Sequence, residues 1–190
     1  MRTFIAIEFE EEVKQYLYKV QEIAKTGCKN GNFTPKENFH LTLRFIGEAD
    51  FDDVERLKEA IFETGKQSKP FSFTLNQLGF FERGEKKIMW FGIDKSIPLY
   101  QLYNRMEKNL ARQGFSRNKQ DLSPHITLAR EVTLFTQPSV LQKKIPIENK
   151  IVQVNKVSLM KSTREGRKMV YEPIYQIDFP NSSKESIKKV

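Results

Sequence analysis

The chain contains two histidines, and each begins the same pattern of His, an apolar residue, Thr and Leu. The two copies are His40-Leu41-Thr42-Leu43 and His125-Ile126-Thr127-Leu128. In an extended strand, side chains i and i+2 share a face, so each imidazole would project beside the Thr hydroxyl of its own motif. An imidazole, with an ordinary pKa near ~6.5, can donate or accept a proton around neutral pH. The two motifs therefore predict acid–base chemistry in one shared site.

Phosphodiester transfer fits these residue types. It needs a base for the attacking oxygen, an acid for the leaving oxygen, and donors for the non-bridging oxygens, which Thr hydroxyls can supply. A lone His is more often structural than catalytic, but the duplicated Thr at the same spacing argues against that interpretation here. We therefore take His40, Thr42, His125 and Thr127 as candidate site residues.

Other reaction classes find little support in the sequence. A zinc site needs three or four ligands, whereas the chain has two distant histidines, one cysteine (Cys28) and no His-Glu-x-x-His pattern. Glycine-rich nucleotide motifs and the Gly-x-Ser-x-Gly pattern of hydrolases are also missing from the sequence. We therefore expect neither a metal nor a cofactor.

Length and charge set further bounds. A chain of 190 residues that is 38% hydrophobic can form one compact, two-lobed domain, which we place at residues 1–180, with a flexible tail at 181–190. The net charge of +8 favours an anionic partner such as RNA or a phosphorylated small molecule. Much of the basic excess lies in residues 142–168, for which a solvated face is the alternative.

Cellular context follows from the cysteine and from hydropathy. Cys28 has no partner for an intrachain disulfide, which suits a reducing compartment. The apolar run at residues 1–7 is too short for a signal peptide, and no run reaches membrane-spanning length. We expect a cytoplasmic monomer that does not bind a membrane.

Periodicity and turn residues predict the elements that must position the two motifs. The motif strands are expected at residues 39–46 and 125–132, with residues 27–38 before the first motif forming a turn and a loop. Helices are expected at 11–25, at 50–65 with an Asp cap, at 96–114 opened by Ser96 and Pro98, and at 137–144; further strands are expected at 2–9, 71–81, 87–94, 150–161 and 169–179.

The order of elements repeats along the chain. Each half has a helix, a loop with a proline, a motif strand, another helix and a hairpin. This predicts an α+β fold with pseudo-twofold symmetry and two lobes, in which antiparallel sheets line a central cleft and helices lie outside.

At these motifs the chain resembles the 2H phosphoesterase superfamily, and within it the RNA 2′,3′-cyclic phosphodiesterases historically called 2′-5′ RNA ligases. The resemblance covers the chain to about Phe179. The matching segments are the opening strand 1–7, the first signature 35–47, a central hairpin with Leu78-Gly79-Phe80-Phe81 and Met89-Trp90, the second signature 123–130, and a last hairpin with 157–162 and Tyr171.

The resemblance implies hydrolysis of a 2′,3′-cyclic phosphate at an RNA end, such as that of a tRNA fragment, to a 2′-phosphate without a metal or cofactor. It leaves a weak reverse 2′-5′ RNA ligation open. By the same resemblance, His40 is the proton donor to the leaving 3′ oxygen and His125 is the base that activates water. Thr42 and Thr127 hold the phosphate. Residue physics alone leaves the two histidines interchangeable.

Two arginines are candidate phosphate ligands. Arg130 lies at a recurrent arginine position of the family, but simple alternation puts it opposite His125, so a bulge, a twist or a strand end must redirect it. Arg44 shares the His40 face under strict alternation, the alternative being an exposed charge at a strand end. Phe80 and Phe81 could stack on a base or belong to the core.

Two other functions remain open at this point. One keeps the site but acts on a small cyclic or 2′-5′-linked nucleotide. The other is a non-catalytic module that binds a nucleotide or RNA, although binding alone would not require a matched acid and base.

Overall fold

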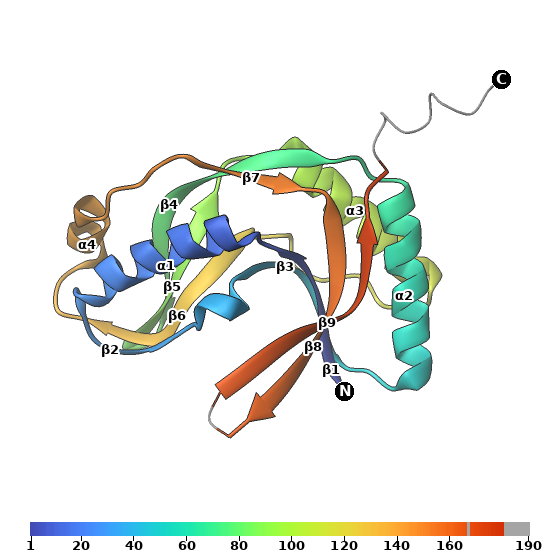
Figure 1. Ribbon diagram of the computed structural model, residues 1–190. Helices are drawn as coiled ribbons and strands as arrows, with labels where there is room; N and C mark the ends of the chain where they lie inside the picture. Colours follow the sequence, from blue (N-terminus) through green and yellow to red (C-terminus); the bar gives the residue numbers. More distant parts are fainter. Residues whose placement is uncertain (167, 181–190) are drawn as a thin grey trace.

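The computed structural model describes residues 1–166 and 168–180, so the tail predicted at 181–190 lies outside the described residues. Figure 1 shows α2 and α3 at one end of the molecule and α4 at the other, with most of the strands between them. In chain order the elements are β1 (Arg2–Glu8), α1 (Glu11–Lys25), β2 (Cys28–Phe33), the short 3-10 helix η1 (Lys36–Asn38), β3 (His40–Glu48), α2 (Phe51–Lys66), β4 (Phe71–Arg83), β5 (Lys86–Ile93), α3 (Ile97–Arg112), β6 (His125–Leu134), α4 (Pro138–Lys144), β7 (Lys150–Val154), β8 (Lys156–Glu165) and β9 (Lys168–Asp178).

The helices begin where the sequence predicts. Asp50 caps α2 by accepting the backbone N–H of Asp53 at 2.8 Å, and the Asp53 carboxylate accepts the N–H of Asp50 at 3.3 Å. Such caps contribute about 1 kcal/mol each, because they satisfy donors that the first helical turn leaves free. Ser96 caps α3 in the same way, through the N–H of Leu99. The predicted caps are confirmed.

The strands form two antiparallel sheets. One has the order β3-β1-β8-β9, and the other has the order β2-β6-β5-β4-β7. Each sheet takes its motif strand from one half of the chain and a hairpin from the other half. The β8–β9 hairpin pairs with β1 in the sheet of β3, and the β4–β5 hairpin pairs with β6. The halves of the sequence are therefore interlocked, and the predicted two-sheet α+β fold is confirmed.

The segment before the first motif differs from the prediction. Residues 27–38 were expected as a turn and a loop, but residues 28–33 form β2, an edge strand that pairs with β6 through Asn32↔Arg130 and Phe33↔Ala129. The segment is polar and contains Gly31, so it lacks the apolar alternation typical of a strand. Hydrogen bonding to β6 stabilises the extended conformation, which the local sequence does not favour by itself.

The predicted strand at 150–161 is two strands. β7 pairs with β4 in one sheet, β8 pairs with β1 in the other, and the chain changes sheets at the exposed Asn155. The buried residues Val152 and Val154 are followed by Val157 and Leu159, so the period of two shifts by one residue at this point. This shift in the sequence pattern could have predicted that the segment divides into two strands.

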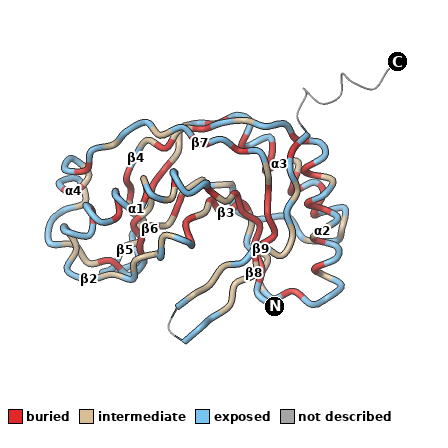
Figure 2. Tube along the Cα trace, viewed as in Figure 1, coloured by how far each residue is buried: buried red, intermediate tan, exposed pale blue. Residues whose placement is uncertain are grey.

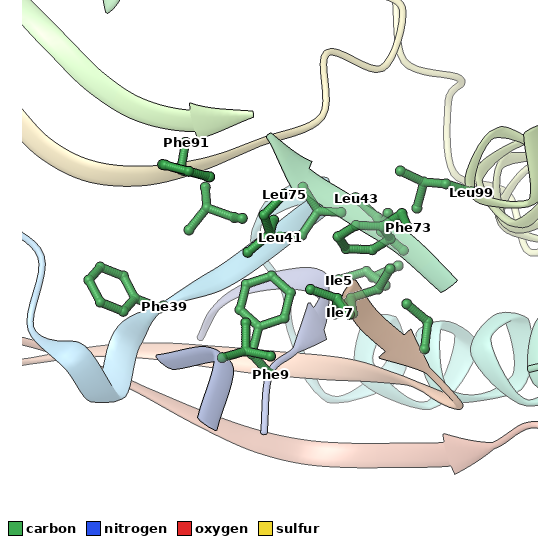
Figure 3. Close-up of a cluster of buried hydrophobic side chains, with 14 of the residues drawn as sticks. Ile5, Ile7, Phe9, Phe39, Leu41, Leu43, Phe73, Leu75, Phe91 and Leu99 are labelled. Atoms are coloured by element: carbon green, nitrogen blue, oxygen red, sulfur yellow. The ribbon is translucent and has the colours of Figure 1, made fainter. Parts of the chain in front are cut away.

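Both motif strands are anchored by the side chains that point away from the histidines. Leu41 and Leu43 are buried with Ile5 of β1, and Figure 3 shows them close to Leu75 of β4. Ile126 of the second motif is fully buried in the same cluster. Burying one such side chain stabilises the fold by about 1.5–3 kcal/mol, so the polar faces of the motifs stay oriented.

Figure 2 shows burial concentrated where the sheets and helices meet, whereas the ends of β8 and β9 project from the body with exposed residues. Within the described ranges, no helix has both the length and the apolar content required to cross a membrane.

Candidate active site

Both motifs face one cleft of about 460 Å³ between the two sheets. All four residues predicted from the motifs line it, so the structure brings together segments far apart in the chain. The cleft is lined by Arg2, Thr3, Phe4, Thr34, Asn38, His40, Thr42, Phe45, His125, Thr127, Arg130, Ser162, Met169 and Tyr171.

The two imidazoles are held by the same kind of hydrogen bond. Nδ1 of His40 lies 2.8 Å from the carbonyl oxygen of Asn38, and Nδ1 of His125 lies 2.7 Å from that of Ser123. In both cases the carbonyl belongs to the residue two positions earlier. Because a carbonyl oxygen can only accept, each Nδ1 carries a proton, and in the neutral ring the lone pair is at Nε2. Nε2 is therefore the reactive nitrogen of both rings.

His40 lies in an enclosed, aromatic environment. Its ring centroid is 4.8 Å from that of Phe4 and 5.3 Å from that of Tyr171, which is perpendicular to it. Nε2 lies 2.9 Å from the hydroxyl oxygen of Thr42, which donates to it when the ring is neutral. Burial lowers the pKa of His40 to about 4, while the Asn38 carbonyl and the Glu8 carboxylate act in the opposite direction.

His125 has a more open environment on the other sheet. Its ring is perpendicular to that of Phe81 at a centroid distance of 5.0 Å, and the indole of Trp90 is 6.5 Å away. Burial also lowers the pKa of His125, the Ser123 carbonyl opposes this, and the positive charge of Arg130 lowers it further. Both free imidazoles are thus neutral at pH 7.

A β-bulge follows the threonine in each motif strand. In β3, Thr42 pairs with Ala6 and Arg44 pairs with the preceding Ile5, so Leu43 is an extra residue. The alternation of faces shifts by one at this point. As a result, Phe45 lines the cleft and Arg44 does not.

The same bulge in β6 has the opposite chemical result. Thr127 pairs with Trp90 and Ala129 pairs with Met89, which leaves Leu128 as the extra residue. Leu128 and Ala129 are both fully buried, and Arg130 then joins the cleft face beside the second motif. Arg130 lies five positions after His125, so simple alternation would put it on the opposite face. The bulge brings it to the cleft, which is one of the three possibilities that the sequence left open.

Arg44 is the one predicted site residue outside the cleft. Its Nη1 lies 3.4 Å from a carboxylate oxygen of Glu107 in α3, and its Nη2 donates to the carbonyl oxygen of Ser116 at 2.6 Å. The side chains of Arg44 and Glu107 are only 12% and 10% exposed. The expected place of Arg44 on the His40 face was wrong, because strict alternation ignored the bulge.

The two candidate stacking residues have different places. Phe80 packs against the hydrophobic core, whereas Phe81 contacts the ring of His125. The described residues of the basic segment 142–168 are spread over α4, β7, β8 and the start of β9, and of these only Ser162 lines the cleft. Lys150 of β7 pairs with Glu12.

Gln21 is a buried residue that sequence reasoning missed. It lies on α1, and its side-chain amide donates to the carbonyl oxygens of Thr34 at 2.8 Å and Leu128 at 2.7 Å. The backbone N–H of Thr34 also donates to the Leu128 carbonyl, at 2.9 Å. These bonds hold the bulge of β6 against the segment after β2. The available signal was a Gln among the apolar residues Val20 and Ala24 of an amphipathic helix.

Several cleft residues were also not predicted. Arg2 and Phe4 alternate along β1, a pattern that the sequence offered, whereas Phe45 reaches the cleft only because of the bulge.

In the described part of the chain, no group of three or more His, Cys, Asp or Glu side chains is placed to hold a metal ion.

Comparison with known proteins extends the likeness to nearly the whole chain. The family model described as the 2′-5′ RNA ligase superfamily matches residues 10–166. A Thermotoga maritima protein named RNA 2′,3′-cyclic phosphodiesterase is 31% identical over 187 residues, covering 94% of this chain and 96% of that protein. A protein of the same name from Methanocaldococcus jannaschii is 27% identical over 178 residues, covering 92% and 98%.

Solved structures agree with this result. A crystal structure described as a phosphoesterase has a TM-score of 0.77 at 25% identity and covers 95% of this chain and 98% of its own. The E. coli protein LigT, solved with 3′-AMP, has a TM-score of 0.76 at 24% identity, with the same coverage. The second likeness bears on the fold alone.

Proposed function

This chain belongs to the 2′-5′ RNA ligase superfamily, and from that premise we propose that it hydrolyses a 2′,3′-cyclic phosphate at an RNA end to a 2′-phosphate. The observation that carries the proposal is the matched pair of imidazoles in one cleft. Each presents Nε2 as its reactive nitrogen, each has a threonine two residues later, and Arg130 adds a positive charge.

The proposed reaction uses the two imidazoles on opposite sides of the phosphorus. Nε2 of His125 accepts a proton from water as the water oxygen bonds to phosphorus, and the bond from phosphorus to the 3′ oxygen breaks. Nε2 of His40 donates its proton to that leaving oxygen. The products are a 2′-phosphate and a 3′ hydroxyl, and one proton returns from His125 to His40 through solvent to complete the cycle.

Threonine and arginine side chains stabilise the charge that builds on the phosphate. The hydroxyls of Thr42 and Thr127 donate to the non-bridging oxygens, and the guanidinium of Arg130 offers charge-assisted hydrogen bonds. When the phosphate binds, Thr42 exchanges its bond to His40 for one to the substrate. Nε2 of His40 is then free for the leaving oxygen.

The electrostatics of the free site do not distinguish the acid from the base. Burial and the positive charge of Arg130 lower the pKa of both imidazoles, and the Glu8 carboxylate opposes this at His40. A bound phosphate anion favours the imidazolium that an acid requires. The assignment of His40 as the acid therefore rests on the family resemblance.

The test is incubation of the protein with a short RNA ending in a 2′,3′-cyclic phosphate, in the presence of EDTA, followed by identification of the product. We expect a 2′-phosphate, and a loss of about 10²–10⁴-fold in kcat for His40→Gln or His125→Gln. Lys119→Gln, at an exposed residue outside the cleft lining, is the control for the substitution itself.

The other outcomes are equally clear. Tight RNA binding without turnover would favour the binding module over the enzyme. Turnover of a nucleoside 2′,3′-cyclic phosphate but not of RNA would favour a small-nucleotide phosphodiesterase. A 3′-phosphate product would overturn the assignment of the leaving oxygen.

A further inference from the structure

We propose that Glu8 is a positioning residue for the proton of His40. Its carboxylate is fixed by two hydrogen bonds beside the first motif, and its negative charge stabilises the imidazolium that protonates the leaving oxygen. The inference rests on the proposed function, in which His40 is the acid, and it assigns a role in the reaction to a residue outside the cleft lining.

Strand register places Glu8 next to His40. The two residues are direct partners in the antiparallel pairing of β1 with β3. Phe4, four positions before Glu8 on β1, contacts the ring of His40, so Glu8 lies on the same side of the sheet as the imidazole. The Cβ atoms of directly opposite residues are about 4.5–5.5 Å apart, which is close enough for a charge to act on a neighbouring ring.

The Glu8 carboxylate is anchored on the side away from His40. Its Oε2 accepts the hydroxyl of Ser158 of β8 at 2.6 Å and the side-chain amide of Gln176 of β9. The Gln176 amide also donates to the hydroxyl oxygen of Ser158, which is fully buried. Both donors are neutral, so they fix the carboxylate without cancelling its charge. The next partners along these strands, Lys156 and Asp178, have opposite charges that offset each other.

The nearby cations oppose the imidazolium of His40. Burial is the largest cause of its lowered pKa, and Arg130 of β6 and Lys14 of α1 lower the pKa further, whereas a backbone carbonyl and Glu8 act in the opposite direction. Tyr171 of β9 contributes a ring without a charge. When a phosphate binds, its negative charge offsets that of Arg130, and the attraction of Glu8 can then favour the protonated ring.

The second motif has a different residue at the corresponding place. His125 pairs with Gly92 of β5, which has no side chain, whereas His40 pairs with Glu8. An acid must hold a proton before the reaction, and a base must be neutral in order to accept one. The anchored carboxylate therefore lies beside the histidine for which a stabilised imidazolium is useful.

The test is the pH dependence of kcat on an RNA tetranucleotide that ends in a 2′,3′-cyclic phosphate, for the wild type and Glu8→Gln. The amide oxygen of Gln can still accept from Ser158 and Gln176, so the variant removes the charge and keeps the hydrogen bonds. We expect the alkaline limb, which reports loss of the His40 proton, to move to lower pH by about one unit. Above the wild-type limb, kcat should then be about tenfold lower. The acid limb, which reports His125, should stay in place.

Two further variants separate the charge from the structure. Glu8→Asp keeps the carboxylate, and its alkaline limb should stay close to that of the wild type. Glu59→Gln removes the same charge at an exposed position of α2 outside the cleft lining, and it should move neither limb. A merely structural role predicts the reverse order, because Glu8→Gln retains the anchoring bonds and the shorter Asp does not.

NMR can follow the two imidazoles separately, because the chain has two histidines. Their signals are assigned with His40→Gln and His125→Gln and titrated in the presence of saturating adenosine 2′-phosphate. In Glu8→Gln the pKa of His40 in this complex should be lower than in the wild type by about one unit, and the pKa of His125 should be unchanged.

Failure of this role and failure of the proposed function give different results. If the wild-type protein turns over no RNA with a cyclic phosphate, the proposed function fails, and the role of Glu8 fails with it. If the wild type is active but Glu8→Gln has the same alkaline limb as Glu59→Gln, Glu8 has no effect on the proton of His40. Equal movement of both limbs, or equal changes at His40 and His125, would also overturn the inference, because the effect would then not be specific to the acid.

Discussion

The two motif strands, β3 and β6, have the same backbone design and different chemistry. Each has His, an apolar residue and Thr, then a bulge at the next residue, Leu43 or Leu128. The bulge brings the residue five positions after the histidine to the cleft. In β3 that residue is Phe45, and in β6 it is Arg130.

The difference teaches how a repeated sequence can make an asymmetric site. In β3 the bulge turns Arg44 toward Glu107 of α3, and the cleft beside His40 is aromatic. In β6 the residue at the corresponding position is the buried Ala129, and the cation faces the cleft. Five positions after its histidine, β3 presents an aromatic ring to the cleft, whereas β6 presents a cation that can hold a phosphate.

The largest expected effect concerns the two histidines and their separate roles. Replacing either with Gln should lower kcat by about 10²–10⁴-fold, because each removes one proton transfer. The pH profiles of the residual kcat/KM should differ. His125→Gln loses the acid limb, since the base is gone, and His40→Gln loses the alkaline limb, since the acid is gone.

The wild-type profile is the reference for this comparison. We expect a bell-shaped kcat/KM with its maximum below pH 6.5, because the pKa of both free imidazoles is lowered. The bell for kcat should lie at higher pH, since bound phosphate favours imidazolium. Loss of the same limb in both variants would contradict the assignment of a separate acid and base.

A second prediction uses the two arginines that the bulges send in opposite directions. Arg44→Met leaves the Glu107 carboxylate without its cation, and should lower the free energy of unfolding by about 3 kcal/mol with kcat/KM within a few-fold. Arg130→Met should lower kcat/KM by about 10²-fold and change stability by less than about 1 kcal/mol. Urea unfolding and initial rates measure both.

Arg44→Met with Glu107→Leu is the matched control, because removing both charges should recover most of the lost stability. If Arg44→Met instead lowered kcat/KM as strongly as Arg130→Met, without loss of stability, the original assignment of Arg44 to the phosphate would return.

A third prediction follows from the pKa of His40. The pKa is about 4 in the folded chain and near ~6.5 when unfolded, so the unfolded state binds more protons between these values. Stability should therefore fall as the pH falls through this window, by about 3 kcal/mol in all from this group. The contribution is fully present above pH 7.

Urea midpoints of the wild type and His40→Gln at pH 7 and pH 4.5 measure this effect. The variant should lose less stability on acidification than the wild type. The same experiment with His125→Gln should give a smaller difference, because that ring is more open to solvent. Equal differences for the two variants would show that the enclosure of His40 by Phe4 and Tyr171 has no electrostatic consequence.

The sequence predicted the features of this site that depend on neighbouring residues in the chain, and it missed those that depend on tertiary pairing. His40, Thr42, His125 and Thr127 were predicted because alternation within a strand is local, and the Asp50 and Ser96 caps were predicted for the same reason. The two bulges are not local. They are set by pairing with β1 and β5, and strict alternation therefore misplaced Arg44.

The edge strand β2 was missed for the same physical reason, and so were the hydrogen bonds from Gln21 to the carbonyl oxygens of Thr34 and Leu128, which we call the clamp. The residues of β2 have weak strand propensity, and pairing with β6 determines their conformation. The hydrogen bonds of Gln21 join α1 to Leu128, more than a hundred positions later in the chain. Helical periodicity shows that Gln21 faces inward, but the carbonyl that it meets is set by the tertiary fold.

The smallest expected effect tests whether the clamp acts through Arg130. Gln21 donates to the Leu128 carbonyl, at the bulge that turns Arg130 into the cleft. Gln21→Met keeps the volume but removes the donor, and should lower kcat/KM about tenfold through misplacement of Arg130. In β3 the bulge is followed instead by the ion pair of Arg44 with Glu107.

A double-mutant cycle distinguishes positioning from a general loss of stability. If Gln21 acts through Arg130, Gln21→Met should cost about tenfold in the wild-type background and close to nothing in Arg130→Met, because the group to be positioned is already missing. A purely structural role would give the same cost in both backgrounds. If the costs of Gln21→Met and Arg130→Met are additive, Gln21 does not set the position of Arg130. The pairing of β6 with β5 would then determine where Arg130 points.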